Sequence, residues 1–213
     1  MERNFFSTYT GIFVGINVVA FILFWVLAFI FGEASIISWV ALKPSSILAG
    51  KYLWTFLTSM FMHAGFGHLL VNMISLVFIG SFVEKLIGKK RFVWLYLVSG
   101  LFAGLFFVLI AFLTGSDLNV YAVGASGALF ALGGILAVLT PKLRVLVFFV
   151  IPLPMWIAMI FMLGVLWVLS LSLGLPIGNV AHLGGLLVGL GYGFYLRKKY
   201  PRKTKMISRY FSR

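Results

Sequence analysis

The stretch TGIFVGINVVAFILFWVLAFIF, residues 10–31, contains no charged side chain. About 20 apolar residues in a helix are enough to cross the hydrocarbon core of a bilayer, so this stretch predicts a transmembrane helix. Further apolar stretches of similar length follow at residues 62–83, 92–113, 122–139, 152–171 and 180–197. The predicted fold is therefore an all-α membrane protein, a compact bundle of six transmembrane helices.

The composition agrees with this fold class. Of the 213 residues, 62% are hydrophobic and only 10% are charged, whereas an ordinary globular domain carries roughly 25% charged residues. In a soluble protein the net charge of +13 would suggest a nucleic-acid ligand. Here the basic residues lie largely at the ends of the apolar stretches, where they set orientation and contact anionic lipid. We therefore expect a lipid partner and no nucleic acid.

The chain contains no cysteine. A disulfide and a thiolate site are therefore both excluded, and we expect neither a cofactor nor a metal. The first apolar stretch is full length and has no small-residue cleavage site after a short apolar core. We expect it to be a retained helix and not a signal peptide.

Lys and Arg are distributed unevenly between the two ends of the predicted bundle. They are concentrated at residues 84–91, 140–144 and 197–213, whereas the turns at residues 114–119 and 174–179 contain none. Cytoplasmic loops of membrane proteins carry an excess of Lys and Arg. The sequence thus predicts a multi-pass protein of the cell membrane with both termini in the cytoplasm.

Three segments need a separate interpretation. Residues 32–61 are too many for a helical hairpin and too apolar for a solvated linker, so we expect a long, partly membrane-embedded outer loop. We assign residues 1–197 to one membrane domain and residues 198–213 to a basic cytoplasmic tail that contacts anionic lipid. At Pro152-Leu153-Pro154 the chain either dips into the membrane interface before residue 155 or the fifth helix is kinked.

A serine and a histidine lie at similar depth in two of the predicted spans. Ser126 is about four residues into the fourth span and His182 about two into the sixth, which places both within about 15 Å of the outer surface at 1.5 Å per residue. Ser126 alone would be interpreted as a helix-packing residue, but a histidine in a membrane helix is rare and usually functional. Neutral imidazole can take the proton of a serine hydroxyl. None of the 4 acidic residues is well placed for a triad, so we predict a Ser126–His182 dyad.

Two more polar residues are candidates for stabilising an oxyanion. His68 and Asn72 are spaced i, i+4 and so share one helix face, and the backbone N–H of Ser126 can supply a further donor. The alternative is that His68 and Asn72 only form hydrogen bonds between helices. His63 is interpreted as structural or interfacial.

Small and aromatic residues are expected to support the dyad. Gly124 and Gly127 flank Ser126, and Phe130 lies four residues beyond it on the same helix face, where it can pack on the ring of His182. Gly185 and Gly189 form a small-xxx-small pattern, which lets two membrane helices approach closely.

These motifs resemble those of the rhomboid family of intramembrane serine proteases in its basic six-span form. Residues 124–127 match the family motif Gly-x-Ser-Gly, which implies that Ser126 is the nucleophile. Residues 181–185 match Ala-His-x-x-Gly, which implies that His182 is the base. Residues 68–72 match His-x-x-x-Asn, which in the family supplies oxyanion donors. The family's Trp-Arg pair of the first outer loop is replaced here by Trp54-Thr55, a departure that concerns loop structure.

The resemblance implies a serine endopeptidase that cuts transmembrane-helix substrates near their outer ends. Substrates must enter sideways from lipid, and the proline break makes the fifth span the candidate movable wall. Two alternatives stay open: a membrane transporter, because polar groups at depth also suit a translocation path, and a non-catalytic relative that binds membrane clients. The sequence predicts no particular oligomeric state.

Overall fold

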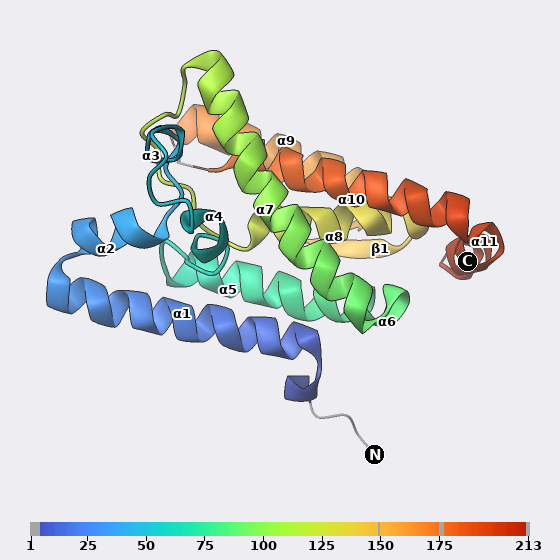
Figure 1. Ribbon diagram of the computed structural model, residues 1–213. Coiled ribbons are helices and arrows are strands. Elements are labelled where there is room, and N and C mark those ends of the chain that lie inside the picture. Colours follow the sequence, from blue (N-terminus) through green and yellow to red (C-terminus); the bar gives the residue numbers. More distant parts are fainter. Residues whose placement is uncertain (1–4, 149, 175–176, 212–213) are drawn as a thin grey trace.

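The structure is a computed structural model that describes residues 5–148, 150–174 and 177–211, so the extreme ends of the two predicted segments, residues 1–4 and 212–213, lie outside it. The long helices are collected into one bundle (Figure 1). We call the end where α8 begins the Ser126 end, and the end with the α6–α7 turn the basic end. In chain order the elements are η1 (Phe5–Ser7), α1 (Tyr9–Phe31), α2 (Glu33–Val40), α3 (Pro44–Leu48), α4 (Thr55–Thr58), α5 (Phe66–Ser75), the π-helical turn η2 (Leu76–Gly80), α6 (Ser81–Ile87), α7 (Lys89–Thr114), α8 (Ser126–Leu139), β1 (Arg144–Val147), β2 (Ile151–Pro154), α9 (Met155–Leu173), α10 (Asn179–Lys199) and α11 (Pro201–Tyr210).

Each predicted span corresponds to a helix, but three of the predicted starts are wrong. The helix predicted from residue 62 begins at Phe66, the one predicted from residue 122 begins at Ser126, and the one predicted from residue 152 begins at Met155. The second difference has a clear cause, because Ala122 is extended and pairs with Leu42 in an isolated antiparallel bridge. This non-local pairing takes residues before Ser126 out of the helix.

Four of the helices are long and apolar enough to cross a membrane: α1, α5 with its continuation to Ile87, α7 and α9. Helix α8 has only 14 residues, about 21 Å at 1.5 Å per residue, which is shorter than the roughly 30 Å hydrocarbon core. Every residue of α8 except Ser126 and Ala137 is buried, so neighbouring helices screen it from lipid. The chain is an all-α membrane protein with a buried central helix.

The long connection between α1 and α5 is ordered by contacts with the segment that precedes α8. Leu42 exchanges two backbone hydrogen bonds with Ala122 (3.1 and 2.8 Å), and the N–H of Ser45 donates to the carbonyl of Leu118 (2.8 Å). The connection also carries an aromatic cluster of the half-buried Tyr52 with the exposed Trp39 and Trp54, in which the indole N–H of Trp54 donates to the Trp39 carbonyl. Aromatic residues of this kind are enriched at membrane interfaces.

The proline-rich segment forms a β-hairpin, and the kinked-helix alternative is wrong. Strands β1 and β2 pair antiparallel with Arg144 opposite Pro154 and Val147 opposite Ile151. Helix α9 then begins at Met155, whose N–H donates to the carbonyl of Leu143 (2.8 Å). The hairpin is therefore joined directly to the start of α9, at the basic end of the bundle.

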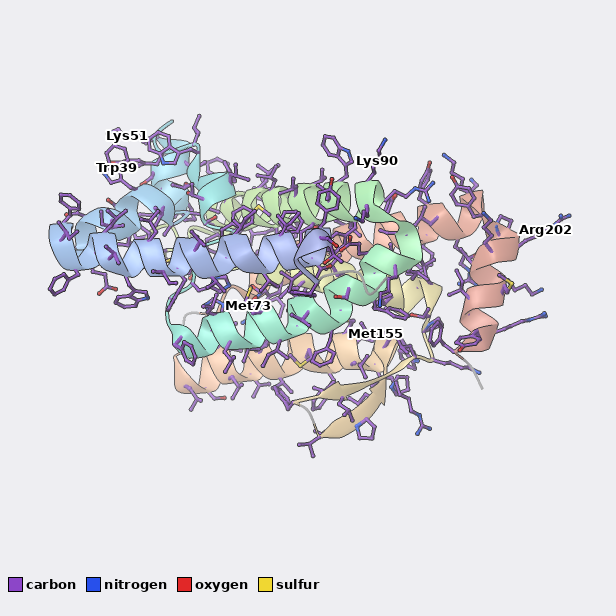
Figure 2. The ribbon with its side chains drawn as sticks, turned by 90° about the horizontal axis from the view of Figure 1, so that it is seen from below. Trp39, Lys51, Met73, Lys90, Met155 and Arg202 are labelled. Atoms are coloured by element: carbon purple, nitrogen blue, oxygen red, sulfur yellow. The ribbon has the colours of Figure 1, made fainter. Side chains whose placement is uncertain are left out.

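The basic tail is helical and lies at the basic end of the bundle, across the direction of the long helices (Figure 2). Helix α10 continues to Lys199 and is followed by α11, in which Thr204 is buried while Arg202 is exposed (Figure 2). At the same end, the buried carboxylate of Glu84 accepts hydrogen bonds from the N–H groups of Tyr9 and Thr10 at 3.1 and 2.8 Å. A carboxylate at a helix N-terminus satisfies orphan N–H groups and the helix dipole, so Glu84 fixes the start of α1.

Candidate active site

Ser126 is the first residue of α8, not a residue one turn inside a helix as predicted. The backbone before it is held by the long connection, where the N–H of Gly124 donates to the carbonyl of Ser59 (2.8 Å). The first N–H groups of a helix have no acceptor within the helix. The backbone N–H of Ser126 is therefore available at the same place as its half-buried hydroxyl.

Gly124 is required by both its backbone and its surroundings. Its φ of +122° lies in a region that residues with a Cβ rarely adopt. A Cβ built on Gly124 would lie 2.9 Å from Nε2 of His68 and 3.7 Å from Oγ of Ser126. The imidazole of His68 and the hydroxyl of Ser126 therefore face the same small volume, and glycine keeps that volume free.

His182 lies in the first turn of α10 and is 7% exposed. Its Nε2 is 2.7 Å from Oγ of Ser126, a hydrogen-bond distance. The Phe130 ring stacks on the imidazole with a centroid separation of 4.6 Å and an interplanar angle of 16°. Within the described part of the chain Nδ1 of His182 has no hydrogen-bond partner, so the ring is oriented by stacking and by Ser126, with no acidic third member.

Helices α8 and α10 approach closely because glycines line their contact. A Cβ on Gly185 would clash with the carbonyl oxygen of Gly127, and a Cβ on Gly189 would clash with that of Ala131. Both clashes are with backbone, which cannot rotate away. The two glycines thus set the helix separation that brings His182 to Ser126.

The side chains of His68 and Asn72 are placed differently with respect to Ser126. The ring of His68 is near Ser126 through Gly124, as described above. Asn72 is 4% exposed, and its amide N–H donates to the backbone carbonyl of His68 one turn earlier (2.8 Å). Its Oδ1 has no partner among the described residues. Asn72 thus borders the site without a hydrogen bond to Ser126 or His182.

Two residues near the site were not predicted from the sequence to belong to it. His63 is fully buried, and its ring lies 5.0 Å from that of His68 in an edge-to-face arrangement. Asn179 is also buried, and its amide N–H donates to the carbonyl of Leu166 on α9 (3.4 Å). The i, i+3 spacing of Asn179 and His182 was a usable signal, because such residues share a helix face.

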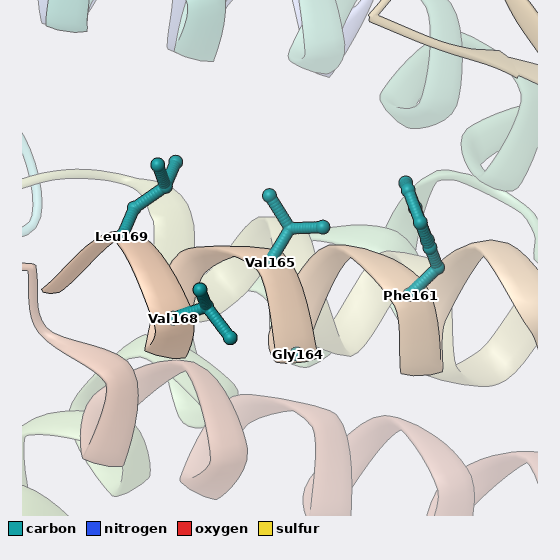
Figure 3. A pocket seen from close by; sticks show the side chains of 5 residues that line it. All are labelled: Phe161, Gly164, Val165, Val168 and Leu169. Atoms are coloured by element: carbon teal, nitrogen blue, oxygen red, sulfur yellow. The ribbon is translucent and has the colours of Figure 1, made fainter. Parts of the chain in front are cut away.

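Helix α9 is attached to the bundle mainly at its first turns. Its buried residues are Met155, Ala158 and Met159, all near the basic end. It packs on α8, α10 and the hairpin, and has no comparable contact with α5 among the described residues. Toward the Ser126 end a cleft of about 370 Å³ lies along α9, and Phe161, Val165 and Leu169 project from the helix into it (Figure 3).

Chemically, this arrangement provides a nucleophile, a base and donors for an anion. A Ser126 hydroxyl bonded to unprotonated Nε2 of His182 can be deprotonated as it attacks a carbonyl. The N–H of Ser126 and the ring of His68 lie beside that hydroxyl, where a tetrahedral intermediate would develop negative charge.

The comparison with protein families gives one match that covers most of the chain. The Rhomboid domain model matches residues 50–199. This range includes Ser126, His182, His68 and Asn72 and all helices from α5 to α10.

Curated relatives are found in plants, fungi and bacteria. RHOMBOID-like protein 1 of Arabidopsis thaliana is 35% identical over 164 residues, 75% of this chain and 39% of the relative. Rhomboid protein 1, mitochondrial, of Saccharomyces cerevisiae is 32% identical over 151 residues, 69% of this chain and 43% of the relative. Rhomboid protease GluP of Bacillus subtilis is 27% identical over 192 residues, 88% of this chain and 34% of the relative. The chain thus spans less than half the length of each.

Proposed function

Since this chain belongs to the rhomboid family, we propose that it is an intramembrane serine endopeptidase acting through a dyad of Ser126 and His182. The observation that carries the proposal is the 2.7 Å separation of Ser126 Oγ and His182 Nε2, in a site where Phe130 stacks on the imidazole. One relative, Rhomboid protease GluP, is a protease by name.

The proposed reaction has two halves. As Ser126 Oγ bonds to the carbonyl carbon of the scissile peptide, Nε2 of His182 takes the hydroxyl proton. The imidazolium then gives this proton to the departing amine nitrogen while the C–N bond breaks, which leaves an acyl-enzyme ester. Water attacks the ester with His182 again as the base, and the carboxylate product leaves with Ser126 restored.

The test is direct labelling of the nucleophile. A serine-reactive phosphonate should modify the purified protein at Ser126, as read by mass spectrometry, and the reconstituted protein should cut a model transmembrane substrate. A non-catalytic relative that binds membrane clients would retain the substrate uncut and would not be labelled. A transporter would move a solute across vesicles and would show neither labelling nor cleavage.

The oxyanion is proposed to be held by the backbone N–H of Ser126 with His68 and Asn72. Asn72→Ala is expected to lower kcat/KM by about 10²–10³-fold, the usual loss for one oxyanion donor, while phosphonate labelling of Ser126 persists. Substrate affinity should change little, because the amide acts mainly on the transition state. Full activity in Asn72→Ala would remove this residue from the oxyanion site.

Substrates are proposed to be transmembrane helices that are cut near the Ser126 end of the bundle. The carbonyl of a helical peptide bond is hydrogen-bonded within the helix, so the segment must unwind before Ser126 can attack it. Unwinding in hydrocarbon leaves backbone groups unsatisfied at a cost of several kcal/mol each. Cleavage near the membrane surface reduces this cost, and Gly or Pro near the cut site reduces it further.

Entry from lipid is proposed to occur between α5 and α9, because α9 is buried mainly at its basic end and, among the described residues, packs on α8, α10 and the hairpin with no comparable contact to α5. Cysteines at Val71 on α5 and Leu169 on α9, joined by a flexible bifunctional linker that contains a disulfide, should block cleavage of a transmembrane substrate. Labelling of Ser126 by a small phosphonate should continue, and reductant should restore cleavage. Undiminished cleavage in the crosslinked protein would place substrate entry elsewhere.

The basic end is proposed to face the cytoplasm, in a six-span protein whose membrane domain is residues 1–197 and whose outer connection, residues 32–61, is partly embedded. The tail, residues 198–213, is proposed to lie on anionic lipid through the exposed side chains of Arg202 and its basic neighbours on α11. The cell membrane is the proposed location, although two relatives, one from Arabidopsis thaliana and one from Saccharomyces cerevisiae, are mitochondrial by name.

This orientation makes a prediction that the cysteine-free chain allows to be tested cleanly. In intact cells a cysteine at Ser116, in the turn after α7, should react with an impermeant maleimide added outside. A cysteine at Lys90, which is exposed at the start of α7 at the basic end, should react only after the membrane is opened. The reverse pattern would invert the proposed topology.

A further inference from the structure

The hairpin of β1 and β2 has an apolar face on each side. Val145 and Val147 of β1 lie on the inner face, where Val147 is buried and Val145 packs against the core. The opposite face includes Leu146, which is 60% exposed, with Pro152 opposite it in the ladder. A two-stranded sheet with one face on a core and one in water should alternate apolar and polar residues. Here the alternation is missing.

The turn of the hairpin continues this apolar outer surface. Phe148 is 50% exposed and Val150 is 76% exposed. Charged residues occur only at the base of the hairpin, where Lys142 and Arg144 are exposed. The hairpin is therefore positively charged where it leaves the bundle, near the end of α8, and apolar at its turn.

The hairpin also has an edge that is adapted to an apolar environment. An unpaired backbone N–H in lipid costs several kcal/mol. Proline has no N–H and cannot donate to a ladder, so in a strand it occupies positions whose nitrogen faces away from the partner. Pro152 and Pro154 are alternate residues of β2, and together they remove two donors from its outward edge.

The position of the hairpin also favours contact with lipid. It does not extend beyond the basic end as α11 does, but runs back beside the bundle and projects sideways near the start of α9, where Met155 is labelled (Figures 1 and 2). On α9 itself Trp156 and Ile160 are exposed by 49% and 64%. The exposed apolar residues of the hairpin are thus followed along the chain by exposed apolar residues of α9, a helix that is long and apolar enough to cross a membrane.

We propose that the β1–β2 hairpin is inserted in the lipid at the basic end of the bundle, with Leu146, Phe148 and Val150 in contact with acyl chains. Lys142 and Arg144 at its base contact the lipid headgroups. The hairpin is then a membrane-inserted element of the fold, and not a solvent-exposed loop. It anchors the end of α9 to which it is joined through the Met155–Leu143 hydrogen bond.

The experiment places a nitroxide on single cysteines in the full-length protein, reconstituted in vesicles that contain anionic lipid. Labels at Leu146 and at Val150 should collide more often with oxygen, which concentrates in lipid, than with a water-soluble nickel chelate. Their collision ratio should match that of a label at Ile160 on α9, the lipid reference. It should differ from that of a label at Lys90, the water reference. Phosphonate labelling of Ser126 in each variant shows that the fold is kept.

Two results would overturn the proposal. Nickel collisions at Leu146 and Val150 as frequent as at Lys90 would put the hairpin in water. Low collision rates with both reagents, together with spin–spin broadening that disappears on dilution with unlabelled protein, would mean that a second copy of the chain covers it. Using two labelled positions separates these outcomes from a local disturbance caused by one substitution.

Discussion

Replacing Ser126 with alanine is expected to abolish cleavage of a transmembrane substrate and leave the fold intact. The side-chain oxygen is the proposed nucleophile, and loss of a serine nucleophile in a serine protease lowers kcat by about 10⁴-fold or more. The structural cost should be small, because the hydroxyl makes one hydrogen bond, to His182, and such a bond contributes about 1 kcal/mol to stability. Cleavage by reconstituted protein and thermal unfolding would be measured together.

The matched control for this variant is Ser99→Ala. Ser99 is a buried serine in α7 whose hydroxyl donates to the carbonyl of Tyr96 in its own helix (3.2 Å). It therefore has the packing role that a membrane-helix serine usually has, and its replacement should leave cleavage near the wild-type rate. Cleavage by Ser126→Ala at the rate of Ser99→Ala would contradict the dyad, whatever the hydrogen-bond geometry.

The helical bundle could be predicted from the sequence because each helix is encoded locally. An apolar run such as residues 10–31 must be helical once it is in lipid, because only a helix satisfies the hydrogen bonds of its backbone there. The errors occurred where a distant segment decides the conformation. Residues 122–125 are apolar and continue into α8, but Leu42 pairs with Ala122 and ends the helix at Ser126. The local hydrophobic pattern gives no indication that Ala122 pairs with Leu42.

The hairpin was left undecided for a related reason. Pro152 and Pro154 indicated a break in the fifth span, which was predicted from residue 152 with a kinked helix as one alternative, whereas α9 begins only at Met155. An apolar run such as residues 145–151 is compatible with either a helix or a strand, and periodicity alone cannot separate them. The antiparallel partner decides between them, and the sequence did not indicate which residues would pair.

The proximity of Ser126 and His182 could be anticipated from depth, because both lie near the starts of helices that run in the same direction. Depth gives the height of a residue in the membrane but not its position across the bundle. That position depends on tertiary contacts, such as the hydrogen bond from the Gly124 N–H to the Ser59 carbonyl and the packing of the His68 ring near Gly124. Similarly, the hydrogen bond from the Asn72 amide to the carbonyl of His68 was not indicated by the sequence, and the oxyanion role of Asn72 stays a prediction.

Adding one methyl group at Gly185 is expected to disrupt the contact between Ser126 and His182 by pushing α10 away from α8. The Cβ of Gly185→Ala would clash with the carbonyl oxygen of Gly127, so α10 must move away from α8. Overpacking of this kind costs about 1–3 kcal/mol of stability. A displacement of about 1 Å in catalytic geometry can cost 10²-fold in rate, because the Ser126–His182 hydrogen bond would lengthen beyond 2.7 Å. Both the thermal midpoint and kcat should fall.

Gly191→Ala is the matched control, since it makes the same chemical change in the same helix. A Cβ on Gly191 meets no atom within 4 Å, and replacing glycine by alanine inside a helix contributes up to about 1 kcal/mol of stability. Gly191→Ala should therefore be as active as the wild type and at least as stable. If both variants behaved alike, the loss in Gly185→Ala could not be assigned to the α8–α10 distance. A loss of activity in Gly185→Ala but not in Gly191→Ala would show that the close α8–α10 distance, which a glycine at position 185 permits, keeps His182 within hydrogen-bond distance of Ser126.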